Sequence, residues 1–150
     1  MKVQQDFKEL LESLNERKVE YLIIGAYALA FHGAPRYTGD MDILVKPDGD
    51  NAQKILKALD DFGFGELELT GDDLTQPGRE IQLGVSPVRI DIMTSLAGLT
   101  WDQAAANRVK GDYGDVPVYF IGKDDFIANK KAMGGHQDLA DIEALGVEAE

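Results

Sequence analysis

Residues 33–45, GAPRYTGDMDILV, place two aspartates, Asp40 and Asp42, one residue apart in a segment that is otherwise typical of a buried strand. Successive side chains of a strand point to opposite faces, so both carboxylates project from the same face with Cβ atoms ~6 to 7 Å apart. Two such carboxylates repel each other unless a cation lies between them or one of them holds a proton. The stretch therefore predicts a strand that carries a carboxylate pair.

The composition is that of a soluble globular protein. The 150 residues are 44% apolar and 28% charged, and we expect one domain over residues 1–150 whose core needs neither disulfides nor a structural metal. No apolar run approaches the ~20 residues of a membrane helix, and the first residues lack the apolar core of a secretory signal. Cysteine is absent, which excludes disulfides, thiolate metal sites and cysteine nucleophiles and agrees with a cytoplasmic protein.

The net charge bears on the kind of partner. Fifteen Lys and Arg residues against 27 Asp and Glu residues give a charge of −12. A field of this sign repels phosphate backbones, so we expect no extended nucleic-acid binding. A locally basic pocket remains compatible with this charge, and no membrane partner is expected.

The remaining sequence alternates between helical and strand patterns, with no repeat and no convincing linker. This alternation predicts an α/β or α+β domain, in which a mixed sheet of about five strands is flanked by helices. Strands are expected at 19–25, 41–45, 65–70, 79–85, 88–94 and 116–121, and helices at 2–17, 26–33, 51–62, 100–109, 124–133 and 137–145.

A third acid lies in one of the later strand candidates. In residues 88–94, VRIDIMT, Asp91 shares one face with Arg89 and has apolar neighbours similar to those of Asp42. Carboxylate pairs with open positions suit Mg²⁺ (or Mn²⁺), which is usually bound through one or two carboxylates and the phosphates of a substrate. A third carboxylate on a neighbouring strand would allow a second metal ion.

A purely structural role for the first two aspartates is the alternative. An aspartate at a strand edge is often a turn or cap residue, and Asp40, which follows Gly39, fits that description. Asp42 fits it less well because apolar residues surround it on the strand, and an isolated buried carboxylate is costly without a partner. The metal interpretation is therefore favoured over the structural one.

The segment before the aspartates has the pattern of a phosphate site. Residues 22–30, LIIGAYALA, predict a strand, a glycine turn and a helix whose first free N–H groups face the strand end. Helix N-termini favour anions through their unpaired donors and their dipole. Gly25 would let the backbone approach a ligand closely.

Residues 23–45, IIGAYALAFHGAPRYTGDMDILV, resemble the signature of the nucleotidyltransferase superfamily, the DNA polymerase beta-like fold. In that signature a glycine and a small residue precede two acids on a strand by about a dozen residues, and a third acid follows on a later strand. The run is most similar to small proteins of the AbiEii toxin and minimal nucleotidyltransferase kind, and residues 124–145 resemble their C-terminal helical segment. The AbiEii-like pattern is carried here by His32, Gly33, Arg36, Thr38, Asp40 and Asp42.

The resemblance implies a reaction and roles for particular residues. An acceptor hydroxyl would attack the α-phosphate of a nucleoside triphosphate (NTP), and pyrophosphate would leave. Asp40 and Asp42 would hold two Mg²⁺ ions, and Asp91 would share the ion that activates the acceptor. Gly25 and Ala26 would cradle the triphosphate.

Three further residues are candidates for nucleotide contacts. Lys130 occupies the place of a lysine that the family uses near the triphosphate. Arg36 would meet a phosphate or, equally, pair with an acid such as Asp40. Thr38 would support Asp40 or serve only as a turn residue, which is the stronger interpretation. The acids near the C-terminus, including Asp138 and Asp141, are interpreted as a solvated surface.

Two departures from the family pattern support a second hypothesis. Ala26 stands where relatives have Ser or Gly, and His136 and Gln137 stand where many have Arg and Lys. A non-catalytic relative that binds nucleotide or a protein partner is therefore the alternative to an active enzyme. The acceptor could be an RNA end, a protein or a small molecule, and the family makes an antitoxin or a neighbouring toxin a plausible partner.

Overall fold

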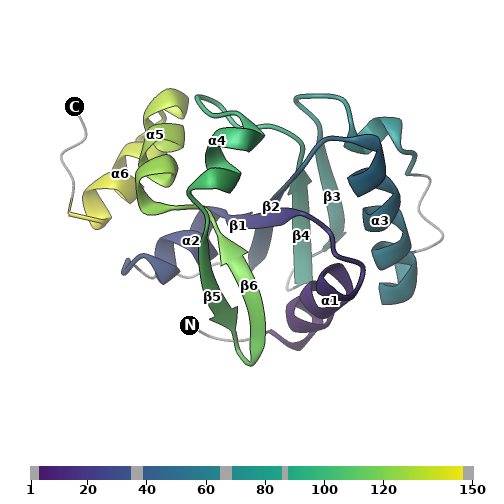
Figure 1. Ribbon diagram of the computed structural model, residues 1–150. Helices are drawn as coiled ribbons and strands as arrows, with labels where there is room; N and C mark the ends of the chain where they lie inside the picture. Colours follow the sequence, from purple (N-terminus) through teal and green to yellow (C-terminus); the bar gives the residue numbers. More distant parts are fainter. Residues whose placement is uncertain (1–3, 35–38, 65–68, 86–87, 147–150) are drawn as a thin grey trace.

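A six-stranded mixed sheet forms the centre of the protein in the computed structural model, which describes residues 4–34, 39–64, 69–85 and 88–146 (Figure 1). The strand order is β3-β4-β2-β1-β6-β5. The pairs β2–β4 and β1–β6 are parallel, and β1–β2, β3–β4 and β5–β6 are antiparallel. The strands are β1 (Tyr21–Ile24), β2 (Asp40–Val45), β3 (Glu80–Val85), β4 (Val88–Met93), β5 (Val109–Tyr113) and β6 (Val116–Phe120).

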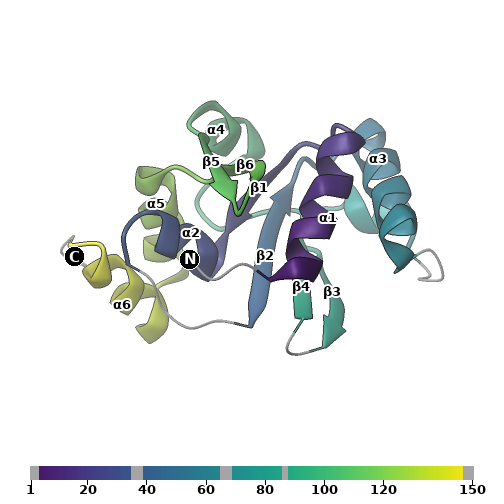
Figure 2. The same ribbon diagram turned by 90° about the horizontal axis from the view of Figure 1, so that it is seen from below.

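Helices cover both faces of this sheet. In Figure 1, α1 lies below β1 and β2 and α4 lies above them, while α5 and α6 lie beside α2 at the left; in Figure 2, seen from below, α1 lies in front of β4 and runs alongside β2. Among the described residues, none of the helices has the length and apolar character needed to cross a membrane. The helices are α1 (Gln5–Glu16), α2 (Gly25–Phe31), α3 (Gly49–Leu59), α4 (Trp101–Ala106), α5 (Lys123–Met133) and α6 (His136–Ala144).

One face of the central strands packs into the hydrophobic core. Met41 and Ile43 of β2 and Ile90 and Ile92 of β4 are at most 1% exposed, and burial of each such side chain contributes about 1.5–3 kcal/mol. The opposite face of the same strands carries Asp42 and the other polar residues, as strand alternation requires. The buried residues of α1 belong to the same core: Phe7, Leu10, Leu11 and Leu14.

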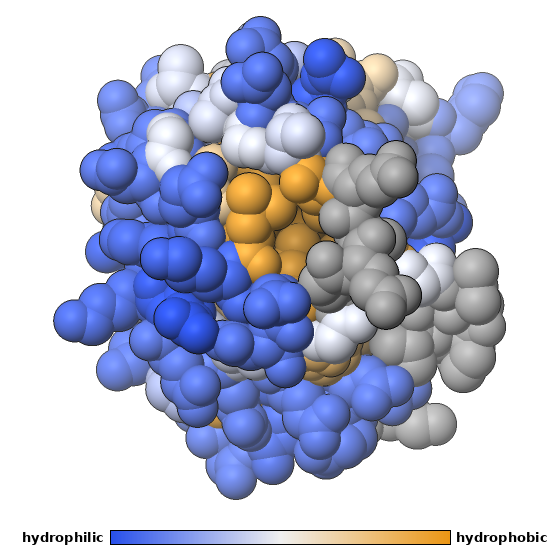
Figure 3. Space-filling view, turned by 90° about the vertical axis from the view of Figure 1, so that its right-hand side faces the viewer, coloured by the Kyte–Doolittle hydropathy of each residue, from blue (hydrophilic) through white to orange (hydrophobic). Residues whose placement is uncertain are grey.

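The side of the molecule that carries α3 has apolar side chains at its surface. Figure 3 shows a central patch of apolar side chains there, with hydrophilic ones on its left and lower sides.

One strand of the sheet, β5, does not correspond to any of the expected strands. Strand β5 was not predicted because Val109 and Lys110 are exposed and the segment lacks apolar alternation; it is an edge strand that pairs only with β6. The helix expected at 100–109 consequently ends at Ala106. Most of the strand expected at 65–70 lies outside the described residues, and its described end, Leu69 and Thr70, is not in a strand.

Candidate active site

Asp42 and Asp91 lie side by side at the centre of the sheet. They are register partners in the parallel pair β2–β4, so their side chains share one face. Asp91 is 4% exposed and Asp42 is half-buried. Asp40, two residues before Asp42, lies on the same face at the start of β2.

The environment of Asp42 favours its neutral form. Burial is the main cause, followed by the charge of Asp91 and a hydrogen bond shared with it, and then by the charges of Asp40 and Glu80; together they raise the pKa of Asp42 to about 7. An opposite charge placed near such a pair would restore the charged form. A positive charge beside the pair would therefore lower the pKa of Asp42 again.

Arg89 supplies one such charge from within the chain. Its Nε and Nη2 donate to Oδ1 and Oδ2 of Asp91 at 3.1 and 3.2 Å, and it is the register partner of Asp40. The side-chain oxygen of Gln82, on β3, accepts from Nε of Arg89 at 2.6 Å in the orientation of its amide that satisfies both ends. Sequence reasoning placed Arg89 and Asp91 on one face but did not identify this ion pair.

Gly25 allows Asp42 to lie against the start of α2. The helix begins directly after β1, and Gly25 has a φ of +68°, a conformation that other residues rarely adopt. A Cβ at this position would overlap the carboxylate of Asp42 and lie 3.1 Å from its Cβ. The neighbouring Ala26 is 5% exposed, so its side chain packs inward and only its backbone is left for a ligand contact.

Lys130 is an internal ion-pair partner in this structure. It lies on α5 with 12% of its side chain exposed, and its Nζ is 3.4 Å from Oδ1 of Asp138 and 3.4 Å from Oδ2 of Asp141, both on α6. Asp141 is 2% exposed and also accepts from Gln137 at 2.9 Å. The interpretation of Asp141 as a solvated surface acid is therefore wrong, because α6 packs it against Lys130.

The other expected nucleotide contacts, Arg36 and Thr38, lie outside the described residues. Within the described ranges, no three acidic or histidine side chains are gathered closely enough to form a ready metal centre. The donor chemistry nevertheless fits a hard divalent cation, because carboxylate oxygens are its preferred ligands. Arg89 is the cation that faces these carboxylates. Its hydrogen bond to Asp91 is the main cause that raises its pKa, and the charges of Asp91, Asp40 and Asp42 raise it further.

Comparisons with known proteins show the fold. Neither protein-family models nor curated proteins match the sequence. Among solved structures, the lincosamide antibiotic adenylyltransferase LnuA, bound to lincomycin, is 17% identical, with 95% of this chain and 96% of that chain covered and a TM-score of 0.62. The antibiotic-resistance factor ANT(2'')-Ia is 12% identical over 94% and 80%, with a TM-score of 0.62.

A third similar structure is an antigenic nucleotidyltransferase-like protein from Paracoccidioides brasiliensis. It is 19% identical, with 91% of this chain and 70% of that chain covered and a TM-score of 0.55. At these identities the likeness establishes the architecture, a mixed sheet flanked by helices in the arrangement of nucleotidyltransferases.

Proposed function

We propose that this chain, which has the nucleotidyltransferase fold, transfers a nucleoside monophosphate from an NTP to a hydroxyl acceptor with the help of Mg²⁺ or Mn²⁺. One observation carries the proposal: Asp42 and Asp91 are register partners on the sheet face, and their proximity and burial raise the pKa of Asp42 to about 7. A carboxylate pair held this closely is stabilised by a bound cation. Perturbed carboxylates of this kind are common in catalytic sites.

The proposal gives each residue a task. Asp40, Asp42 and Asp91 would hold the metal ions, which when bound lower the pKa of the attacking hydroxyl and offset charge on the leaving pyrophosphate. The backbone of Gly25 and Ala26 would approach the triphosphate. Contacts to the nucleotide would come from Arg36, Thr38 and Lys130.

Two ion pairs would have to rearrange for this to happen. Arg89 donates to both oxygens of Asp91 and would release at least one of them to a metal ion. Lys130 would exchange a carboxylate partner, Asp138 or Asp141, for a phosphate. Both partners of each pair remain in the chain, so the released groups can return when products leave.

The acceptor is a small molecule, a protein or an RNA end. The names of two neighbours describe an adenylyltransferase of lincosamide antibiotics and an antibiotic-resistance factor, which supports a small acceptor. The charge of −12 also disfavours a long polynucleotide. Pairing with an antitoxin or a neighbouring toxin, which the sequence resemblance to AbiEii-type proteins implies, belongs to the same proposal.

A second candidate is a non-catalytic relative that binds nucleotide or a protein partner through the same site. The observation that favours it is the saturation of Asp91 by Arg89, together with the engagement of Lys130 by two carboxylates. Ala26 also lacks the hydroxyl that a serine would offer to phosphate.

A labelling experiment separates the two candidates. The purified protein is incubated with each α-³²P NTP, Mg²⁺ and a cell extract, beside the Asp40→Ala/Asp42→Ala variant and the exposed-site control Asp124→Ala. Transfer of label by the wild type and by Asp124→Ala, and its loss in the double variant, supports the enzyme. If the double variant still transfers label, Asp40 and Asp42 are not required for the reaction. If the wild type binds NTP in a Mg²⁺-dependent way but transfers no label, the non-catalytic candidate is favoured.

A further inference from the structure

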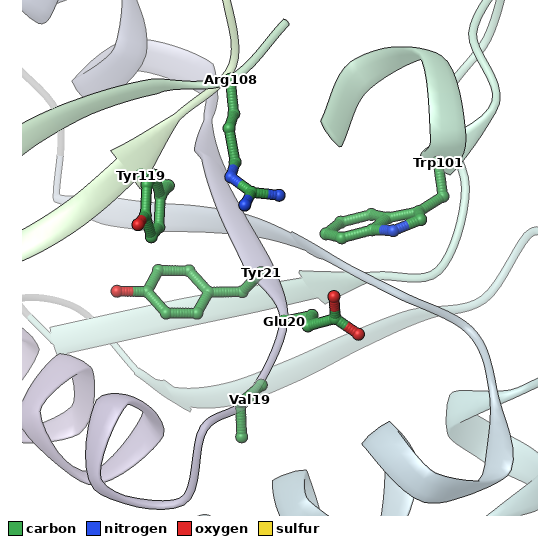
Figure 4. Close-up of a pocket in the computed structure, with 6 residues that line it drawn as sticks. All are labelled: Val19, Glu20, Tyr21, Trp101, Arg108 and Tyr119. Carbon is green, nitrogen blue, oxygen red and sulfur yellow. The ribbon is translucent and has the colours of Figure 1, made fainter. Parts of the chain in front are cut away.

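A second candidate site lies in a groove between α4 and the start of β1. The groove has a volume of about 590 Å³, within the range of small-molecule sites. Figure 4 shows a smaller pocket that shares Glu20, Trp101, Arg108 and Tyr119 with the groove; there Trp101 and Arg108 point into the same space above Glu20 and Tyr21. The residues that matter for its chemistry are Glu20, Lys46, Trp101, Arg108, Lys110 and Tyr119.

The groove is separate from the carboxylates of the candidate active site. Strand alternation puts Lys46 on the same sheet face as Asp42, but four residues further along the chain, which corresponds to ~13 Å. Tyr119 and Lys110 are register partners in β5–β6 and so share a face. The groove therefore borders the end of β2 that lies away from Asp40 and Asp42.

Flat surfaces line the groove on two sides. Trp101 comes from α4, and Tyr119 comes from β6 with 38% of its surface exposed. The guanidinium of Arg108 lies over the Tyr119 ring at 4.8 Å from its centroid. A planar ring that enters here meets an indole and a stacked arginine–tyrosine pair, which are the surfaces on which bases stack.

The groove is also locally basic in an acidic protein. It is lined by three cations, Lys46, Arg108 and Lys110, and by two acids, Glu20 and Asp102, whereas the chain as a whole carries −12. Lys46 is engaged by Glu20 and Asp48, each at 3.4 Å. In the described part of the chain, Arg108 and Lys110 form no ion pair, so their charges are available to an anion.

We propose that this groove binds a nucleoside monophosphate without a metal ion. The base would stack between Trp101 and the Arg108–Tyr119 pair, and the phosphate would meet Arg108 and Lys110. A guanidinium matches a phosphate through two parallel hydrogen bonds, which explains the choice of a phosphorylated ring over a neutral one. The inference goes beyond the proposed function, since none of the carboxylates of the active site takes part.

Trp101 is the only tryptophan of the chain and therefore reports on this groove alone. Its fluorescence is followed in EDTA while AMP is added, with adenosine and ribose 5-phosphate as partial ligands. We expect saturable quenching by AMP and at least tenfold weaker binding of each partial ligand, because each lacks one of the two contacts. Equal binding of adenosine, or no quenching by AMP, overturns the proposal.

Substitutions locate the ligand. Arg108→Ala and Lys110→Glu should each weaken AMP binding at least tenfold, while the control Lys123→Ala, an exposed lysine on α5, should bind as the wild type. Circular dichroism establishes that each variant is folded. Asp42→Asn should leave AMP binding unchanged. Loss of AMP binding in that variant would show that AMP binds at the carboxylates of the candidate active site, and would refute a second site. Because the assay contains no metal, it succeeds or fails independently of the proposed transferase activity.

Discussion

Arg89 holds both oxygens of Asp91 from two residues away on the same face of β4, with donor–acceptor distances of 3.1 and 3.2 Å. Asp91 in turn is the register partner of Asp42, so one arginine neutralises one member of a carboxylate pair. Burial, and after it the charge and hydrogen bond of Asp91 and the charges of Asp40 and Glu80, raise the pKa of Asp42 to about 7. A site that is short of positive charge in this way should respond measurably to pH, to metal ions and to the loss of its arginine.

The Asp42→Asn variant should be more stable than the wild type at pH 8 in EDTA. Folding raises the pKa of Asp42 from 3.8 to about 7, so the folded state binds more protons between these values and the free energy of unfolding falls as pH rises through this window. Asparagine carries no charge at any pH in this window, so the variant does not lose stability in this way. The gain should be roughly 2–4 kcal/mol at pH 8 and should shrink towards pH 5.

Urea denaturation of both proteins at several pH values between 5 and 8 measures this difference. If the free energies of unfolding of the two proteins differ by the same amount at every pH in this range, Asp42 is ionised in the folded protein throughout.

Divalent cations should stabilise the wild-type protein. Burial and the charges of neighbouring acids raise the pKa of Asp42, and a cation beside Asp42 and Asp91 would offset both effects. Binding to the folded state alone raises the Tm as the metal concentration increases. We expect a rise in Tm with saturating Mn²⁺ or Mg²⁺ at pH 8 and almost none in Asp42→Asn. An unchanged wild-type Tm at saturating Mn²⁺ would count against the metal site.

Removal of Arg89 should change the response to metal in a specific way. In Arg89→Ala, Asp91 loses its partner while it remains buried, so the metal-free protein should unfold at a lower temperature than the wild type. A metal ion would then no longer compete with the guanidinium for the Asp91 oxygens. The rise in Tm on addition of Mn²⁺ should therefore exceed that of the wild type; a smaller rise would show that Arg89 assists metal binding.

Alanine at position 25 should reduce the free energy of unfolding more than alanine at another glycine with a similar backbone conformation. Gly25 and Gly78 have φ values of +68° and +74°, but a Cβ at Gly78 would meet no atom within 4 Å. Gly78→Ala should cost about 1–2 kcal/mol, the penalty of the left-handed conformation. Gly25→Ala should cost more, roughly 2–4 kcal/mol, because its Cβ also displaces Asp42. Equal losses in urea denaturation would show that Asp42 moves aside freely.

The strands that carry the carboxylates were predictable because their side chains follow the period of a half-buried strand. Asp42 and Asp91 each interrupt an apolar run at the position that faces away from the core, so the sequence indicates both the strands and the exceptional residues. The Arg89–Asp91 pair follows from the same alternation, since residues two apart share a face. The alternation indicates the shared face but not the contact itself.

Other features depend on packing between distant segments and leave little local signal. Strand β5 has exposed residues at its start and owes its conformation to pairing with β6. Asp141 lies in a helix with little apolar periodicity, and only the docking of α6 on α5 buries it against Lys130. The groove beside Trp101 likewise combines residues of α4, β5 and β6 with Glu20 and Lys46, which lie just outside β1 and β2, and no single motif would indicate it.

Replacement of Lys130 tests whether this lysine holds the C-terminal helices together. Its Nζ lies 3.4 Å from both Asp138 and Asp141, and Asp141 is 2% exposed. Lys130→Gln would leave two carboxylates near each other without their cation, and removal of one partner of a buried pair typically costs about 3–5 kcal/mol. Because Lys130 retains 12% exposure, we expect a loss nearer 2–3 kcal/mol. Lys131→Gln, the exposed neighbour on the same helix, should change stability by less than about 0.5 kcal/mol. Urea denaturation of the two variants measures both losses, and similar values would show that the ion pairs of Lys130 contribute nothing to the docking of α6.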